Sequence, residues 1–256
     1  MFLGLSMMQV GYGQRTKPVV TNSKKVAPEP KKIKDEEEID YSHVTTYGAT
    51  TNTNSGILGG FVIRNSRRLE NTLFGKTAFR YMALEVVNVK HPKELPTQSP
   101  SGSRFVPGKL NYLFVLRPQY GREIILSSRN GDEGIAINAI LAAGLSIGIQ
   151  KPYYVQYQVK PGQVRTEPYN PAVQPIESIL GTGGLLQGLD KSTLIPGLNF
   201  KAALSFELSA FRNNLTGIEV GFLLETLSQK AVIMSFAENN SFYSSAYVTI
   251  YFGNKK

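Results

Sequence analysis

Residues 134–150 read GIAINAILAAGLSIGIQ. The odd-numbered positions are all apolar, whereas the even-numbered positions are mostly small or polar, as at Asn138, Gly144 and Ser146. A period of two residues is typical of a β-strand with two different faces. The stretch therefore predicts a strand, and it leaves open whether the apolar face lies in a soluble core or against lipid.

The same alternation recurs along the chain. Four further segments have one apolar row and an opposite row that contains small, aromatic or charged side chains: 110–117, 198–210, 217–226 and 242–253. The two faces of 76–90 cannot be assigned from the sequence. Turn-forming residues between these segments predict eight strands, at 41–50, 56–66, 76–90, 109–127, 134–159, 197–211, 216–229 and 242–253.

The connections between the predicted strands fall into two classes. Those after the second, fourth and sixth strands are short, and those after the third, fifth and seventh are longer; the tight first connection is an exception. Short turns at one end and long loops at the other are typical of outer-membrane barrels. Both termini would then be periplasmic, residues 160–196 would form the longest extracellular loop, and Tyr153 and Tyr157 would belong to an interfacial aromatic girdle.

Several features favour lipid over water as the solvent of the apolar rows. Charged residues make up 18% of the chain, below the roughly 25% of soluble domains. The opposite rows combine small residues with isolated charges, as a narrow barrel lumen requires. The predicted strand 134–159 exceeds the ~9–11 residues that cross a bilayer. We therefore predict an all-β fold, an eight-stranded antiparallel transmembrane β-barrel of the outer-membrane type.

The alternation assigns side chains to the two faces of this barrel. Charges inside a lumen must be paired to be tolerated, so we interpret the inward charges as a structural network, consisting of Arg64, Arg117, Lys201, Glu207, Glu219 and Glu225. The side chains expected to face lipid are Ile135, Ile137, Leu141, Leu145, Ile147, Phe200, Leu204, Phe206, Val220, Phe222, Val248 and Ile250.

The N-terminal 40 residues differ from the rest. Residues 1–13 resemble a signal peptide whose basic start is missing, as in a truncated one. Residues 14–40 form a charged, Pro-containing linker that we expect to be disordered and periplasmic, and 41–256 form the barrel. The net charge of +9 lies almost entirely outside the linker. The sequence has no nucleic-acid-binding motif, so anionic lipid headgroups are a more natural partner for this positive charge than nucleic acid.

No catalytic pattern is found. His43 and His91 fall at opposite ends of the predicted barrel, and neither joins a Ser and a carboxylate in a nucleophilic motif. The chain has no cysteine. The stretch GTGGLLQG at 181–188 lacks the Lys-Ser/Thr ending of a phosphate loop and is interpreted as a flexible loop. We therefore expect no enzyme activity, no cofactor, no metal site and no small-molecule substrate.

Three segments resemble a known family: TTNTNSGILGGFVIRNSR (50–67), FRYMALEVVNVKHPKE (79–94) and KLNYLFVLRPQYGREIIL (109–126). They are similar to the PorG family, small outer-membrane proteins of the type IX secretion system of Bacteroidetes. The resemblance covers about residues 41–253 and is weakest in 14–40. It implies an eight-stranded barrel that anchors or positions the periplasmic ring of the secretion and gliding machinery, built from PorK-like and PorN-like proteins.

The resemblance directs attention to the periplasmic turns, predicted at Asn65–Asn71, Arg129–Glu133 and Arg212–Thr216. The candidate contacts there are Arg67, Arg68, Arg129 and Arg212. An equally good interpretation of the first turn is that its arginines lie at the level of the lipid headgroups. Two different functions stay open for the whole chain: a generic barrel that binds an extracellular partner through 160–196, and a soluble secreted β-barrel or sandwich.

Overall fold

The structure is a computed structural model that describes residues 41–128, 134–211 and 214–256. The expected signal peptide at 1–13, the linker at 14–40, Arg129 and Arg212 lie outside the described residues. No helix within the described ranges is long and apolar enough to cross a bilayer.

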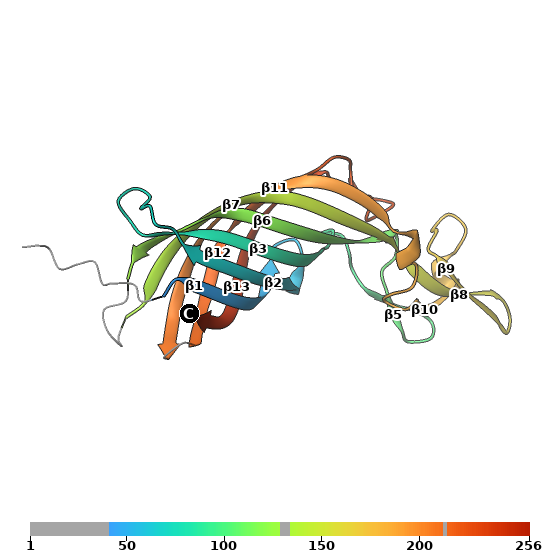
Figure 1. The fold of residues 1–256 in the computed structure, drawn as a ribbon. Coiled ribbons are helices and arrows are strands. Elements are labelled where there is room, and N and C mark those ends of the chain that lie inside the picture. Colours follow the sequence, from blue (N-terminus) through green and yellow to red (C-terminus); the bar gives the residue numbers. More distant parts are fainter. Residues whose placement is uncertain (1–40, 129–133, 212–213) are drawn as a thin grey trace, which may run out of the picture. The chain divides into compact units, whose positions relative to one another are not determined.

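Eight strands close into one antiparallel barrel, in the order β1-β13-β12-β11-β7-β6-β3-β2 (Figure 1). Because β1 pairs with β13, the barrel has no free sheet edge. The predicted all-β, eight-stranded antiparallel barrel is confirmed. Its strands are β1 (His43–Asn52), β2 (Gly56–Arg68), β3 (Ala78–Val89), β6 (Asn111–Ser127), β7 (Ala136–Pro152), β11 (Thr193–Phe211), β12 (Asn214–Leu227) and β13 (Phe242–Lys255).

Alternating burial along the strands separates a lumen from an outer face. In β7 the even positions from Ala136 to Gly148 are buried or partly buried, whereas Leu141 and Leu145 are exposed. The faces of β3, which the sequence left open, follow the same rule: Tyr81 is buried in the lumen and Met82 is exposed. Both rows of β3 are rich in apolar residues, so only the closed sheet shows which row points inward.

The connections sort into two ends. At one end, which we call the turn end, 69–77, 128–135 and 212–213 join the strands; at the other, the loop end, the connections are 53–55, 90–110, 153–192 and 228–241. The predicted division into short turns and long loops is confirmed. One turn begins later than predicted: β2 continues to Arg68, so Asn65–Arg68 pair with β1 and β3 and belong to the strand.

The longest connection is itself folded. The predicted strand 134–159 divides at Tyr153, and a separate sheet follows, made of β8 (Tyr154–Lys160), β9 (Gln163–Pro168) and β10 (Ile179–Thr182). Pro161-Gly162 turns β8 into β9, with the left-handed φ of 81° at Gly162 that a Pro-Gly turn favours. The expected flexible loop at 181–188 is thus corrected in part, because β10 pairs with β8. The other short elements are β4 (Thr97–Gln98), β5 (Arg104–Phe105) and two 3-10 helices, η1 (Ile176–Ser178) and η2 (Leu189–Lys191).

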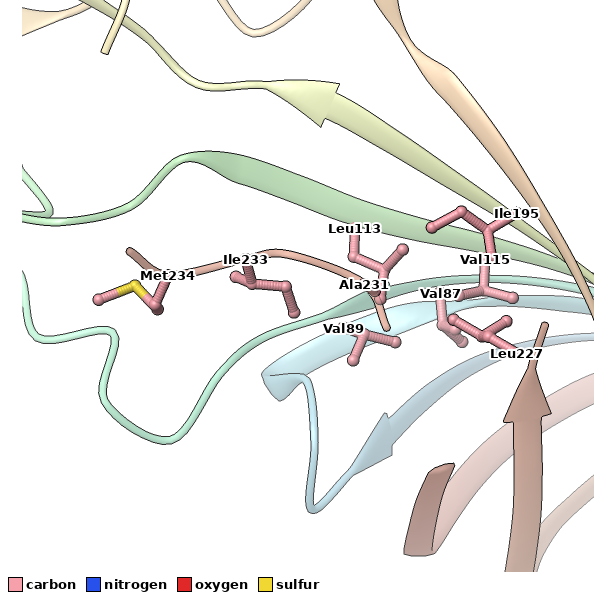
Figure 2. Packing of buried hydrophobic residues seen from close by; sticks show 9 residues of the cluster. All are labelled: Val87, Val89, Leu113, Val115, Ile195, Leu227, Ala231, Ile233 and Met234. Atoms are coloured by element: carbon pink, nitrogen blue, oxygen red, sulfur yellow. The ribbon is translucent and has the colours of Figure 1, made fainter. Parts of the chain in front are cut away.

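An apolar cluster lies inside the loop end of the barrel (Figure 2). It joins inward side chains of four strands to a segment of the last connection, and its members are Val87, Val89, Leu113, Val115, Ile195, Leu227, Ala231, Ile233 and Met234. Burial of each large aliphatic side chain contributes about 1.5–3 kcal/mol. The connection 228–241 is therefore fixed against the barrel as a plug.

Candidate functional site

The middle of the lumen holds a cluster of opposite charges. Glu219 of β12 accepts hydrogen bonds from Arg64 Nη1 at 3.1 Å and from the Tyr247 hydroxyl at 2.6 Å. Lys201 Nζ lies 2.8 Å from the same carboxylate and 3.4 Å from the Tyr81 hydroxyl. One carboxylate thus serves two buried cations that come from β2 and β11.

A second cluster lies nearer the loop end. Arg117 donates from Nε and Nη2 to both carboxylate oxygens of Glu225, at 2.8 and 2.7 Å. Paired donation of this kind is the strongest geometry available to a guanidinium. Glu85 lies 3.7 Å from Arg117 Nη1, and the Ser146 hydroxyl donates to Glu225 at 2.5 Å. This cluster ties β6 to β12 across the barrel.

A third cluster lies at the turn end. Glu207 accepts from Lys255 Nζ at 2.6 Å and from Asn138 Nδ2 at 3.1 Å. Asn138 also donates to Glu123 at 3.0 Å, and the Ser66 hydroxyl donates to the other Glu123 oxygen at 2.6 Å. The space left among these side chains is about 10 Å³, about enough for a single water molecule.

The structure therefore places the charges assigned from the sequence inside the barrel, each paired with an opposite charge; they are Arg64, Arg117, Lys201, Glu207, Glu219 and Glu225. They form separate clusters instead of one network. Sequence reasoning missed Glu85 because the faces of 76–90 were unassigned, and it missed Glu123 because the predicted alternation ended at residue 117. Extending the odd row of that strand from Arg117 to Gln119 and Glu123 would have found it.

The lumen is thus filled by charge clusters and closed by the apolar plug. Eight-stranded barrels have interiors just wide enough for side chains. Arg117, Lys201 and Glu219 are each no more than 3% exposed. Side chains in contact with one another thus occupy the middle of the lumen, and the surfaces left for a partner are the outer face of the barrel and its two ends.

The outer face carries the side chains that we expected to meet lipid. All twelve side chains of that set point away from the lumen. The most exposed are Phe222 at 69%, Leu145 at 59%, Leu141 at 52%, and Ile135 and Ile250 at 49%. A groove of about 920 Å³ crosses this face, where small residues stand beside larger ones: Ala139, Leu141, Ala202, Phe222, Ala246 and Val248.

The two aromatic residues expected in an interfacial girdle lie elsewhere. Tyr153 is 1% exposed and packs with Phe105, Val155, Tyr169 and Ile179 in the core of the folded connection. Its hydroxyl accepts the backbone N–H of Val106 at 3.1 Å. Tyr157 is packed against the same core. The girdle assignment is wrong because the chain leaves the barrel wall at Tyr153, where the uninterrupted alternation in the sequence suggested a continuing strand.

A buried ion pair links the two ends of the connection 90–110. Lys109 Nζ contacts the Glu94 carboxylate, and both side chains are buried. Burial lowers the pKa of Lys109, and the Glu94 charge opposes this shift. Burial also raises the pKa of Tyr153. Both groups lie outside the barrel strands, at the base of a lobe that we define as residues 90–110 together with 153–192.

The histidines have structural surroundings. The His43 ring lies 3.0 Å from Asn65 Nδ2 at the turn end, and His91 Nε2 lies 3.1 Å from the Glu238 carbonyl at the loop end. Among the residues that the structure describes, no group of three His, Asp or Glu side chains could hold a metal ion. The candidate contact Arg67 is exposed on β2 beside the exposed Arg68.

No protein family and no curated protein matches the chain. Two solved structures are similar in fold. Neisserial surface protein A is 8% identical, with a TM-score of 0.38, over 84% of this chain and 97% of that chain. Ail, the attachment invasion locus protein of Yersinia pestis in complex with the heparin analogue sucrose octasulfate, is 10% identical, with a TM-score of 0.36 and the same coverage of both chains. At these values neither likeness assigns a function.

Proposed function

We propose that residues 41–256 form an outer-membrane barrel that serves as an anchor and has no enzymatic function. One observation carries the proposal: apolar side chains are outside and charges are inside. Phe222 is 69% exposed, whereas Lys201 and Glu219 are 2% and 3% exposed. A water-soluble protein seldom exposes such a continuous apolar surface. Lipid is the solvent that fits it, because transmembrane barrels alternate apolar outward and polar inward.

Since the lumen is filled, the barrel would act through its two ends. If the turn end and both termini are periplasmic, as in outer-membrane barrels generally, that end can meet periplasmic proteins. The resemblance of 50–67, 79–94 and 109–126 to the PorG family supports one partner, the periplasmic ring of a type IX secretion and gliding machinery. In this proposal the barrel holds PorK-like and PorN-like ring proteins at the membrane. Of the described contact candidates, Arg68 is the one that we assign to these proteins.

A specific observation favours a second candidate, binding of an extracellular partner at the loop end. The lobe has its own apolar core around Tyr153, so its shape is fixed. It also exposes apolar side chains, with Leu186 at 76%, Val173 at 70% and Leu185 at 66%. Exposed apolar side chains on an ordered lobe are suited to a protein partner.

Extraction and gel mobility test the membrane proposal. A barrel in the bilayer should remain with membranes through urea and carbonate washes, and it should migrate faster unboiled than boiled. Release into buffer without detergent would overturn the proposal and favour a soluble β-barrel.

Matched variants then distinguish the two ends. Pull-down of ring proteins should be lost with Arg68→Glu and retained with Leu185→Asp/Leu186→Asp. The reverse result would favour the extracellular partner. Both variants change exposed side chains, and each should retain the faster unboiled mobility that marks a folded barrel.

A further inference from the structure

Three arginines lie next to one another on the outer face near the turn end. Arg67 of β2 pairs directly with Arg80 of β3, and Arg80 pairs directly with Arg122 of β6. All three occupy the outward row, because the inward neighbours Ser66, Tyr81 and Glu123 are buried. Directly opposed residues have Cα atoms about 4.5–5.5 Å apart. The three arginines therefore form a short ladder across three strands.

The positive charge of this ladder is not neutralised within the described chain. Arg67, Arg80 and Arg122 form no ion pair with any carboxylate of the described residues. Arg122 Nη1 donates to two neutral acceptors, the Tyr120 hydroxyl and the Gly121 carbonyl, each at 3.0 Å. Like charges directly opposite each other destabilise a sheet. In the lumen, by contrast, the cations Arg64, Arg117 and Lys201 each contact a carboxylate. The arginines of the ladder differ from them and can take their counter-charge from outside the chain.

The ladder lies where the apolar outward rows of β2, β3 and β6 end. Toward the loop end, the next outward residues are Met82 on β3 and Tyr120 on β6, which are 45% and 52% exposed. On β2, Asn65 lies between Arg67 and Ile63, which is 51% exposed. Four other strands carry apolar residues at described outward positions near the turn end: Ile137, Leu208, Ile218 and Phe252. On β1, His43 lies directly opposite Arg67. Among the residues that the structure describes, the three arginines therefore form a local basic site.

We propose that Arg67, Arg80 and Arg122 bind the headgroup of an anionic phospholipid, in which no choline or other cation neutralises the phosphate, and that its acyl chains lie along Ile63, Met82 and Leu84. Guanidinium groups match phosphate oxygens in geometry and retain their charge at membrane surfaces. The inference rests on the proposed membrane insertion and goes beyond it by naming a lipid class and its residues. It assigns Arg67 to lipid, in preference to a periplasmic protein.

The proposal predicts that the effect of Arg80→Gln on barrel stability depends on whether the membrane contains anionic lipid. In phosphatidylcholine vesicles Arg80→Gln removes repulsion from Arg67 and Arg122, so the barrel should be as stable as the wild type or more stable. In vesicles that also contain phosphatidylglycerol the same variant should lose a favourable contact, and its unfolding equilibrium constant should rise about fivefold relative to the wild type. Arg165→Gln, an equal charge change in the exposed Arg165–Glu167 pair of the lobe, is the control and should show no dependence on phosphatidylglycerol.

Three results would contradict the lipid site or the proposal on which it rests. Equal responses of Arg80→Gln and Arg165→Gln to phosphatidylglycerol would overturn the site while leaving the membrane barrel intact. If inorganic phosphate, added to phosphatidylcholine vesicles, stabilised the wild type as phosphatidylglycerol does, the site would bind a free anion and the lipid proposal would be wrong. If the wild type failed to insert into either vesicle, the proposed function itself would fall. Loss of the phosphatidylglycerol effect at high salt is expected, because screening weakens exposed charge contacts.

Discussion

The charge cluster around Glu219 gives the sharpest test of how the lumen is held together. Glu219→Gln keeps the shape of the side chain and removes the carboxylate that contacts both Arg64, at 3.1 Å, and Lys201, at 2.8 Å. Removing one partner of a buried ion pair costs about 3–5 kcal/mol, because the remaining charge is left uncompensated. Here two cations remain, but Arg64 lies over the Tyr251 ring and Lys201 over the Tyr247 ring, at 4.6 and 4.7 Å. These contacts soften the penalty, so we expect a loss of about 3 kcal/mol.

The assay is guanidinium unfolding of the barrel in lipid vesicles, followed by the heat-modifiable band on gels. The control is Glu167→Gln, which breaks a pair whose side chains are 55% and 45% exposed and should cost about 0–1 kcal/mol. Adding Lys201→Met to Glu219→Gln should recover part of the loss, because one uncompensated cation disappears. The reasoning would be refuted if Glu219→Gln lost no more stability than Glu167→Gln, or if the double variant were weaker than the single one.

The outer face, the lumen and the lobe give three more predictions. Phe222→Arg should destabilise the inserted barrel by about 2–4 kcal/mol, because the charge enters the lipid-facing band. The control Phe236→Arg, at a 78% exposed loop position, should change stability little. Equal losses of the two variants in vesicle unfolding would contradict the lipid assignment. Gly217→Ala should lower stability by about 1–3 kcal/mol, because the new Cβ would lie 2.3 Å from the Tyr251 hydroxyl, which is hydrogen-bonded to Ser205 at 2.7 Å. Thermal unfolding should show no such loss for the control Gly184→Ala, whose Cβ would meet no atom closer than 3.9 Å. Burial raises the pKa of Tyr153 above its ordinary 10.0, so the contribution of its neutral side chain to lobe stability is full below pH 10.0 and is lost as pH rises through the folded pKa. Limited proteolysis of the lobe should therefore increase more steeply above pH 10.0 in the wild type than in Tyr153→Phe. Identical pH profiles of the two proteins would disprove the assignment.

The sequence by itself determined the class of fold and most of the face assignments. Where one row is apolar and the other carries small or charged residues, as in 134–150 and 198–210, a period of two fixes which side chains share a face. The turn-forming residues between the alternating segments predicted the strand count, and the lengths of the connections predicted the division into turn end and loop end. These properties are local, so a single sequence carries them.

Only the tertiary structure decided how charges and loops pair across the barrel. Arg117 and Glu225 are distant in the sequence, and the closed sheet brings them together at 2.7 Å. The chain leaves the barrel wall at Tyr153 because that ring packs against Phe105 and Tyr169 from other segments, although the alternation continues through β8. The arginine ladder likewise depends on strand register, which sets Arg67, Arg80 and Arg122 side by side. A period of two fixes the face that a residue occupies, whereas its neighbour across the sheet is set by the register of distant strands.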